Sequence, residues 1–374
     1  MKIAFISLMG GQPWGGSEVL WSKTAELALE QGHKVFVSVY RFPEIPIPIA
    51  KLKEKGAFIH FRERYNPNQS IFKKLNNYLK KSGVYRKLWD FKPDHILISQ
   101  GNNFDLVVHH YRLFEEIKQN NIPYSIICHS HSQYGFIPGK NIYPRGKEVF
   151  LKAKNIFFVS NRQKGLTERN LCTELNNAKI TWNPLNIKTK KYLTWPDNRI
   201  VQFAMVAGLT SGKGHDTLFE ILSHEKWKTR DWHLNIYGDG DGKMYLNDLV
   251  KWYNINDKIT FHGYVNDIKT VWKKNHILLI PSAGEGLPMS LCEAMICGRP
   301  AVATDVGGHS EVISEGETGF IADASTASSF ANALDKAWFN IEKWEEMGKK
   351  ASSFAFKKIN LKPHESLLSG HILS

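Results

Sequence analysis

The sequence predicts an α/β protein with two domains, each built on a parallel sheet. The chain has 374 residues, more than one hydrophobic core ordinarily supports, so two domains are the default expectation. Short apolar runs alternate with helical patterns along both halves of the chain, as in successive βαβ units. Several runs end in glycine-rich loops, which is where open α/β sheets bind phosphorylated ligands.

The composition is that of a globular protein. Hydrophobic residues make up 42% and charged residues 23%, and no apolar run approaches the roughly 18 residues that a membrane span needs. The opening MKIAFISLMGG is too short before its glycines for a secretory signal, and predicts a strand. The four cysteines are scattered without a Cys-x-x-Cys pair, so we expect no disulfide, no zinc site and a cytoplasmic location.

The net charge of +13 is unevenly distributed. Residues 51–92 carry twelve Lys or Arg and three Asp or Glu, which favours phosphate-rich partners. Within them, residues 71–81 place apolar side chains on one helical face among lysines, and Gly83 is expected to end that helix. Two interpretations stay open: a helix that lies on an anionic membrane at the inner face, and a surface helix packed on its own domain. No nucleic-acid-binding motif accompanies the charge.

The first half opens with a βαβ pattern. A strand is expected over residues 1–8, a helix after the glycine loop at 10–16, and a second strand over 34–40. The loop presents N–H groups at a helix N-terminus, which suits an anion, but it is not the GxGxxG dinucleotide motif. Glycines that merely permit a tight turn explain the loop equally well.

Further strands of the first half end in polar residues. They are expected over 95–101, 124–132 and 155–160, followed by a helix over 162–175. His129 and His131 lie two apart and therefore share a face of their strand. They are either ligand-contacting groups or a hydrogen-bonded structural pair, and a zinc site would need more ligands.

A polar, proline-bearing segment at 188–199 predicts a linker before a second strand–helix series. Its strands are expected within residues 200–208, 233–242, 258–265, 276–286 and 300–308. Lys213 lies between two glycines in the first turn of this series, where a lysine binds phosphate as a point charge. A solvated surface lysine is the alternative. The loop lacks the Walker A spacing.

The stretch from 281 to 311 concentrates the candidate site. Glu285 lies in a glycine-rich loop and Glu293 inside a short apolar helix. Pro288 suits the first turn of that helix and Gly298 the left-handed residue that ends it. Taken singly, each glutamate would more often be a solvated charge on a helix face.

The order of these motifs resembles a known family. VAGLTSGKGHDTL, LNIYGDGD, ITFHGYV, SAGEGLPMSLCEAM and AVATDVGGHSEVISEGETGF follow one another as in family 4 glycosyltransferases, which are retaining enzymes. The resemblance implies the GT-B fold, two Rossmann-like domains facing a central cleft. Residues 1–186 would form the acceptor-side domain and 187–355 the nucleotide-sugar-binding domain. Residues 356–374 would be a tail, with a helix that returns to the first domain.

The resemblance implies catalytic roles by matching position. Lys213 would contact the donor diphosphate, Glu285 the hydroxyls of the transferred sugar, and His129 would lie near that sugar. The sequence HSH fits the family histidine in either register, and we favour His129 over His131. Retaining hydrolases use a carboxylate nucleophile, but Glu285 matches a donor-binding residue. We therefore expect front-face transfer.

The same matching implies a wider donor site. Glu293 would hold the ribose hydroxyls, Gly15 and Gly16 would lie beside the diphosphate, and the main chain at Tyr264 and Val265 would meet the nucleobase. The backbone of three further residues would assist Glu285: Gly286, Leu287 and Pro288. The family usually has an arginine where this chain has Gly208, so one of two phosphate cations is missing.

The resemblance implies an enzyme that moves a hexose-type sugar from a UDP- or GDP-linked donor to a glycan or lipid-linked acceptor. Its setting would be the synthesis of cell-surface polysaccharide or glycoconjugate, without a cofactor. Asp-x-Asp occurs only within the glycine motif at 238–242, which disfavours a metal-dependent GT-A enzyme. The alternative is a catalytically weak homologue that binds nucleotide or glycan for a partner. A Rossmann dehydrogenase is disfavoured because GxGxxG is absent.

Overall fold

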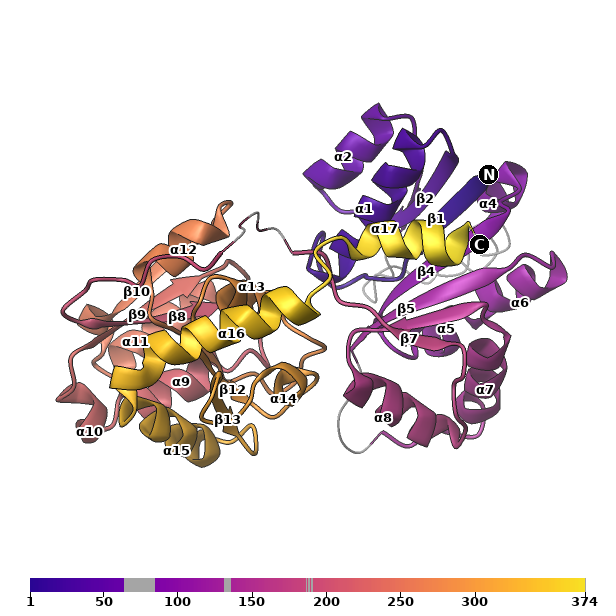
Figure 1. Cartoon of the computed structure of the whole chain (residues 1–374). Helices are drawn as coiled ribbons and strands as arrows, with labels where there is room; N and C mark the ends of the chain where they lie inside the picture. Colours follow the sequence, from indigo (N-terminus) through magenta and orange to yellow (C-terminus); the bar gives the residue numbers. More distant parts are fainter. Residues whose placement is uncertain (64–84, 131–135, 186, 188, 190, 374) are drawn as a thin grey trace. The chain divides into compact units, whose positions relative to one another are not determined.

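The structure, a computed structural model, describes residues 1–63, 85–130, 136–185, 187, 189 and 191–373. The chain divides into two compact units (Figure 1). Unit 1 comprises Met1–Pro184 and Asn360–Ser374, and unit 2 comprises Leu185–Ile359. Each unit contains one parallel sheet with helices packed against it, so the predicted α/β class is confirmed.

Unit 1 contains a seven-stranded sheet in the order β3-β2-β1-β4-β5-β6-β7. The chain runs outward from β1 to β3 and then returns to the other side of β1, so the order reverses between β1 and β4. Loops at such a reversal diverge at the carboxyl edge and leave room for a ligand. The strands are β1 (Lys2–Ser7), β2 (Lys34–Tyr40), β3 (Phe58–Arg62), β4 (His95–Asn102), β5 (Tyr124–Ser130), β6 (Asn155–Phe158) and β7 (Ala178–Ile180).

The helices of unit 1 cover its sheet and include the end of the chain. α17 packs against α1 (Figure 1). Leu367, Leu368 and Ile372 share a buried core with Leu20 and Trp21. The described helices are α1 (Ser17–Glu30), α2 (Ile47–Glu54), α4 (Arg86–Phe91), α5 (Asp105–His109), α6 (Tyr111–Gln119), α7 (Ile142–Lys152), α8 (Asn161–Leu171), α17 (Pro363–Leu367) and the π-helical turn η4 (Leu368–Ile372).

Unit 2 contains a six-stranded sheet in the order β10-β9-β8-β11-β12-β13, with the reversal between β8 and β11. Its strands are β8 (Val201–Val206), β9 (Trp232–Tyr237), β10 (Ile259–Gly263), β11 (Ile277–Ile280), β12 (Ala301–Thr304) and β13 (Gly319–Ala322). Its helices are α9 (His215–Leu222), α10 (Glu225–Lys228), α11 (Lys243–Trp252), α12 (Ile268–Lys274), α13 (Met289–Ile296), α14 (His309–Val312), α15 (Ala327–Trp338) and α16 (Trp344–Lys358), with short 3-10 turns at η2 (Asn256–Lys258) and η3 (Ile341–Lys343).

The segment predicted as a linker is fastened to unit 2 by one buried arginine. Arg299 is fully buried, and its guanidinium donates to the carbonyls of Leu193 (3.4 Å) and Thr194 (2.7 Å). Its Nε donates to the carbonyls of Trp272 and Asn275. A buried guanidinium needs such acceptors, because an unsatisfied buried charge is strongly destabilising.

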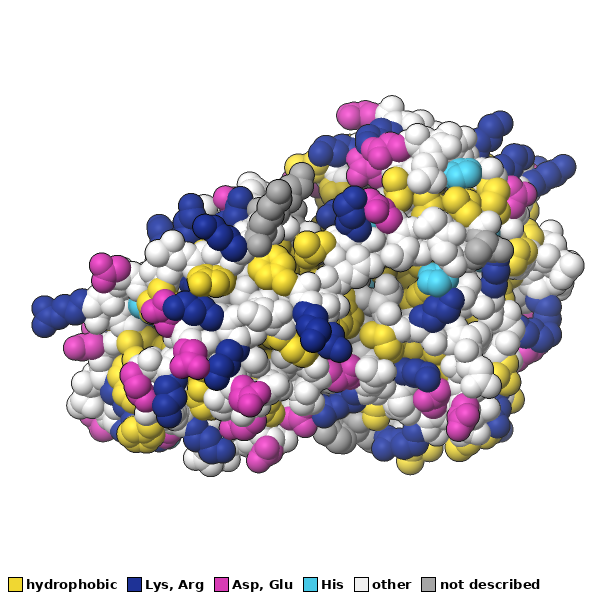
Figure 2. Space-filling view, viewed as in Figure 1, with side chains coloured by type: hydrophobic (Ala, Val, Ile, Leu, Met, Phe, Trp, Pro, Cys, Tyr) yellow, Lys and Arg dark blue, Asp and Glu magenta, His cyan; other side chains and the backbone are white. Residues whose placement is uncertain are grey.

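Several sequence predictions need adjustment or fall outside the described residues. The helix expected over 162–175 ends at Leu171, because Cys172 adopts a left-handed conformation with φ of 47°. The basic helix expected over 71–81, with Gly83, lies outside the described residues. Among the described residues, no helix combines the length and apolarity to cross a membrane. Figure 2 shows basic and acidic side chains interspersed over the visible face of unit 2.

Candidate functional site

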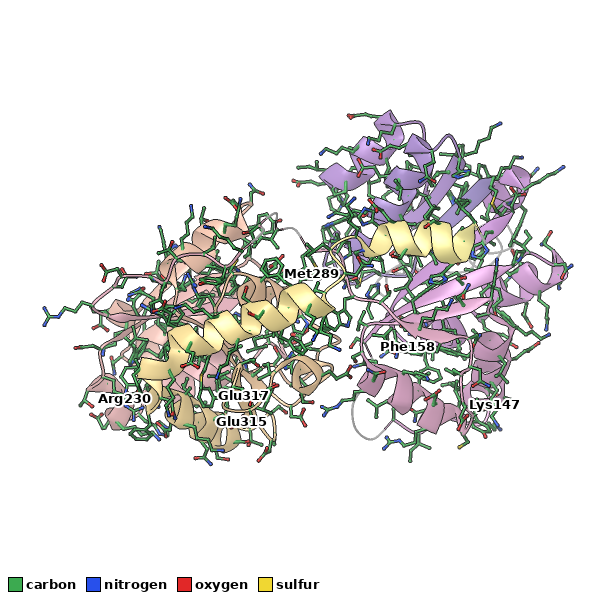
Figure 3. All side chains as sticks on the ribbon, viewed as in Figure 1. Lys147, Phe158, Arg230, Met289, Glu315 and Glu317 are labelled. Carbon is green, nitrogen blue, oxygen red and sulfur yellow. The ribbon has the colours of Figure 1, made fainter. Side chains whose placement is uncertain are left out.

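The loop between β11 and α13 positions Glu285. It follows β11, which ends at Ile280, and leads into α13 at Met289, the residue labelled in Figure 3. Pro288 caps the helix with an extended backbone (ψ of 131°), so it precedes the first turn in which it was expected. Gly298 follows the helix with φ of 79°, as predicted. The loop therefore ends where the N–H groups of the first helical turn have no carbonyl partner within the helix.

Glu285 forms an ion pair with Lys213 across the carboxyl edge of the sheet. Lys213 Nζ lies 2.7 Å from Glu285 Oε1, and Ser282 Oγ donates to the same oxygen at 2.9 Å. The Glu285 side chain is 14% exposed and that of Lys213 is 30% exposed. Ser282 is held in turn, because Thr304 donates its hydroxyl to the Ser282 carbonyl at 2.6 Å. The structure thus brings together a cation and a carboxylate that are 72 residues apart.

Close backbone contacts hold the loops of this edge together. At Gly214 (φ of 80°) a Cβ would lie 2.3 Å from the Pro281 carbonyl oxygen, and at Gly307 (φ of 55°) one would lie 2.3 Å from that of Glu285. Both the conformation and the space therefore require glycine. Gly308 donates its N–H to the carbonyl of Gly286 at 2.6 Å, which fixes the chain beside Glu285.

The loop that contains Gly208 lies against the glycine motif at 238–242. Leu209 donates to the carbonyl of Asp239 at 3.1 Å, and Gly238 donates to that of Gly263 at 2.8 Å. The second bond brings the predicted nucleobase residues to the same edge, directly after Gly263. A Cβ at Gly208 would have the Asp239 carbonyl oxygen as its nearest neighbour, at 3.7 Å. The site lacks the family arginine but has ordinary room for a side chain at that position.

The residues predicted to meet the nucleobase and the residue predicted to hold the ribose differ in their solvent exposure. Tyr264 is 76% exposed and Val265 is half-buried, so this segment lies at the surface of unit 2. Glu293 lies on α13, one helical turn beyond Met289, and is 6% exposed. Neither Glu293 nor Glu285 is a solvated surface charge, so that alternative is wrong.

In unit 1, His129 lies at the carboxyl end of β5. Its Nε2 is 3.2 Å from Ser99 Oγ on β4, and the residue is 7% exposed. Burial lowers the pKa of His129 to about 4, so the imidazole is neutral at physiological pH. Within the described residues its Nδ1 has no hydrogen-bond partner. His131, the alternative histidine, lies outside the described residues.

Gly15 and Gly16 precede α1 at the same edge of unit 1. Gly16 is the N-cap residue, and the N–H of Glu18 donates to the carbonyl of Gly15 at 3.0 Å. This places the glycine pair where backbone N–H groups favour an anion. Among the described residues, no three His, Cys, Asp or Glu side chains gather as a metal site would require.

Sequence reasoning missed Glu18, which the structure buries beneath the glycine loop. Glu18 is 4% exposed, and Ser7 Oγ at the end of β1 donates to its Oε1 at 3.0 Å. Burial raises the pKa of Glu18 to about 7, while the Ser7 hydrogen bond and the charge of Arg62 act in the opposite direction. The available signal was its position directly after the glycine loop, as the second residue of α1.

A family model and two relatives in sequence are all described as glycosyltransferases. A sequence model of the family described as "Glycosyl transferases group 1" matches residues 189–354. An uncharacterized glycosyltransferase of Haemophilus influenzae is 27% identical over 241 residues, which cover 64% of this chain and 67% of that protein. The Escherichia coli UDP-Gal:alpha-D-GlcNAc-diphosphoundecaprenol alpha-1,3-galactosyltransferase is 23% identical over 200 residues, 50% of this chain and 46% of its own length.

A solved structure resembles this chain over its whole length. HepE from Anabaena, crystallised in complex with UDP, aligns over 100% of both chains with a TM-score of 0.75 at 16% identity. Its likeness extends over both units, including the part of the chain that precedes residue 189. At this identity the likeness establishes the fold.

Proposed function

Because this chain belongs to the glycosyltransferases of the GT-B fold, we propose that it is a retaining hexosyltransferase that uses a nucleotide-sugar donor. The observation that carries the proposal is the Lys213–Glu285 pair at the carboxyl edge of unit 2, held between interlocked glycine loops. A diphosphate and a sugar need two different partners at one place. This pair supplies a cation for the first and a hydrogen-bond acceptor for the second.

Lys213 would stabilise the departing diphosphate. Breaking the bond between the sugar C1 and the phosphate oxygen builds negative charge on the leaving group, which a fixed cation and helix N-terminal N–H groups favour. Lys213 is held by Glu285 and flanked by glycines that permit close approach. A protein cation in this position makes a metal unnecessary, so we propose a metal-independent reaction with no cofactor besides the donor, which is linked to UDP or GDP.

Glu285 would bind the hydroxyls of the transferred sugar, with the backbone from Gly286 to Pro288 beside it. Glu293, buried on the following helix, would bind the ribose. In the proposed front-face transfer, the bond from C1 to the acceptor oxygen forms on the side from which the diphosphate leaves. The acceptor hydroxyl gives its proton to a donor phosphate oxygen. His129, neutral at physiological pH, would contact the sugar without carrying a charge.

The experiment is an activity and binding screen with purified protein. A thermal-shift panel of UDP- and GDP-sugars should show one donor that raises the melting temperature, because binding to the folded state stabilises it. Slow hydrolysis of that donor should be lost in Glu285→Ala and kept in Glu317→Ala, a matched exposed glutamate of the same unit. A glycosyl adduct on Glu285 trapped by mass spectrometry would contradict front-face transfer. Inversion at C1, observed by NMR, would contradict retention.

We propose that the acceptor is a glycan or a lipid-linked glycan, used in cell-surface polysaccharide or glycoconjugate synthesis on the cytoplasmic side of the membrane. The support is the charge of residues 51–92, part of which lies outside the described residues. Sedimentation with anionic liposomes at low salt, lost at high salt, is the expected behaviour. Failure to sediment at low salt would remove membrane contact from the proposal.

Gly208 supports a second candidate, a catalytically weak homologue that binds nucleotide or glycan for a partner protein. The lost arginine would weaken the hold on the diphosphate. In that case the thermal-shift panel would still identify a nucleotide ligand, while hydrolysis and transfer would stay at background with every donor.

A further inference from the structure

Ser282 lies where three loops of unit 2 meet at the carboxyl edge of the sheet. It follows the end of β11 by two positions and is 1% exposed. Its loop is joined to the turn before α9, because the N–H of Ala283 donates to the carbonyl of Gly212 at 2.8 Å. The same loop is joined to the turn after β12, because Gly308 donates to the carbonyl of Gly286. Neighbouring turns therefore fix the backbone around Ser282.

Thr304 holds the backbone of Ser282 directly. Thr304 is fully buried at the end of β12, and its hydroxyl donates to the Ser282 carbonyl at 2.6 Å. The Thr304 carbonyl lies 2.7 Å from Nδ1 of His309, which is also fully buried. Because a carbonyl oxygen only accepts, Nδ1 carries the hydrogen of this bond. A buried chain of hydrogen bonds therefore connects the turn at 304–309 to Ser282.

The hydroxyl of Ser282 orients the side chain of Glu285. Its Oγ donates to Glu285 Oε1 at 2.9 Å, and Lys213 Nζ lies 2.7 Å from the same oxygen. A glutamate side chain rotates about three bonds, so a fixed backbone alone does not determine where its carboxylate lies. Hydrogen bonds to an ionised group are stronger than those between neutral groups. Ser282 and Lys213 therefore hold one carboxylate oxygen together.

The two partners of this oxygen differ in what a donor would do to them. A diphosphate carries more negative charge than a carboxylate and would compete with Glu285 for Lys213. The Ser282 hydroxyl is uncharged and buried, so a diphosphate does not draw it away. The hydrogen bond from Ser282 is therefore a contact that Glu285 keeps when Lys213 turns to the diphosphate.

We propose that Ser282 is a positioning residue, held by Thr304, that keeps the Glu285 carboxylate directed at the transferred sugar while Lys213 binds the diphosphate. The proposal rests on the proposed transferase function and deepens it. Ser282 and Thr304 act through Glu285 and touch no donor atom in this role. Loss of the Ser282 hydroxyl should therefore impair the step at the sugar and leave binding of the nucleoside diphosphate intact.

The first experiment separates these two effects. Calorimetry with UDP and GDP measures binding without a sugar, and hydrolysis of UDP-glucose, UDP-N-acetylglucosamine and GDP-mannose measures the step at the sugar. Ser282→Ala should bind the nucleotide within about twofold of wild type and lower kcat by about tenfold or more, because a hydrogen bond to a charged group contributes on this scale. Ser352→Ala should match wild type in both measurements. Ser352 is equally buried, at 1% exposure, and donates to the carbonyl of Ile296 on α13.

A double-mutant cycle tests the contact without any ligand. Ser282→Ala, Glu285→Ala and the double variant are compared with wild type by urea unfolding. Ser282→Ala should raise the equilibrium constant for unfolding by about fivefold when Glu285 is present and by less when Glu285 is alanine, because only the first change removes their hydrogen bond. Thr304→Val should likewise lower kcat in the wild-type background and have little further effect in Ser282→Ala.

The outcomes distinguish the positioning role from a structural one. Loss of nucleotide binding together with kcat in Ser282→Ala would show that the whole loop is disrupted and would overturn the proposal. A wild-type kcat in Ser282→Ala, or additive costs in the cycle, would also overturn it. If the wild type binds no nucleotide and hydrolyses no nucleotide sugar, the proposed function fails, while coupling in the cycle still shows that Ser282 orients Glu285.

Discussion

The carboxyl edges of the two units share one architecture and differ in chemistry. In unit 2 the loops are locked by backbone hydrogen bonds around a Lys213–Glu285 ion pair. In unit 1 the corresponding edge has a buried acid, Glu18, and a neutral histidine, His129, among aromatic side chains. A charged diphosphate needs fixed charge, whereas an uncharged sugar needs flat apolar surface and hydrogen-bonding groups. The two edges therefore present different electrostatic environments on one kind of fold.

The largest expected effect comes from removing the cation of unit 2. Lys213→Met keeps the length of the side chain but should lower kcat by about 10²–10³-fold, because the leaving diphosphate loses its fixed positive partner. The measurement is steady-state transfer or donor hydrolysis with the donor found by thermal shift. Lys251→Met, at a 71% exposed lysine of α11, is the control. Equal rates for Lys213→Met and wild type would remove Lys213 from the mechanism.

Next in size is the close packing of the loops in unit 2. Gly214→Ala should destabilise the protein by about 3 kcal/mol or more, because its Cβ would meet the Pro281 carbonyl oxygen at 2.3 Å and its φ is positive. Gly316→Ala has a similar φ of 73° but open space around the Cβ, and should cost only about 1 kcal/mol. Urea unfolding of both variants gives the comparison. A cost at Gly214 no greater than at Gly316 would show that the loops move apart easily.

The stability of the protein should depend on pH because of Glu18, the buried acid of unit 1. The pKa of Glu18 is raised by burial from 4.5 to about 7, so the folded protein retains a proton that the unfolded chain releases between these values. The stabilisation is complete below pH 4.5 and is lost as pH rises to 7, by about 3 kcal/mol at most. Glu18→Gln lacks this titration, so its stability relative to wild type should increase from pH 5 to pH 8. A difference that does not vary with pH would show that Glu18 is ionised throughout.

The smallest expected effect restores the family arginine to unit 2. Gly208→Arg meets no close atom at its Cβ and would add a second cation beside the proposed position of the donor diphosphate. Donor binding should tighten by about tenfold, on the order of 1.4 kcal/mol, measured by calorimetry or the thermal-shift midpoint. Gly208→Gln, a neutral side chain of related length, is the matched control. Equal tightening in both variants would assign the effect to packing rather than charge.

Local pattern predicted the framework of both units because apolar periodicity and glycine position act over a few residues. The strands at 34–40, 95–101 and 233–237 were expected on that basis and are present. β3 and β13 were not predicted. β3 is partly exposed along its length and β13 has only four residues, so neither gives a clear pattern. Pro288 was expected in the first turn of α13 but is the N-cap residue just before it, because a helix start is ambiguous by about one residue.

The sequence by itself determined which residue types were available: the glycine loops, the two glutamates of 281–311 and a lysine between glycines. Only the tertiary structure decided which of them meet. Lys213 pairs with Glu285 because β8 and β11 are neighbours in the sheet, and strand order depends on contacts that no local pattern encodes. Likewise, Glu18 is an ordinary helix residue by sequence. Its burial in the tertiary structure raises the pKa of its carboxyl to about 7, although the hydrogen bond from Ser7 acts in the opposite direction.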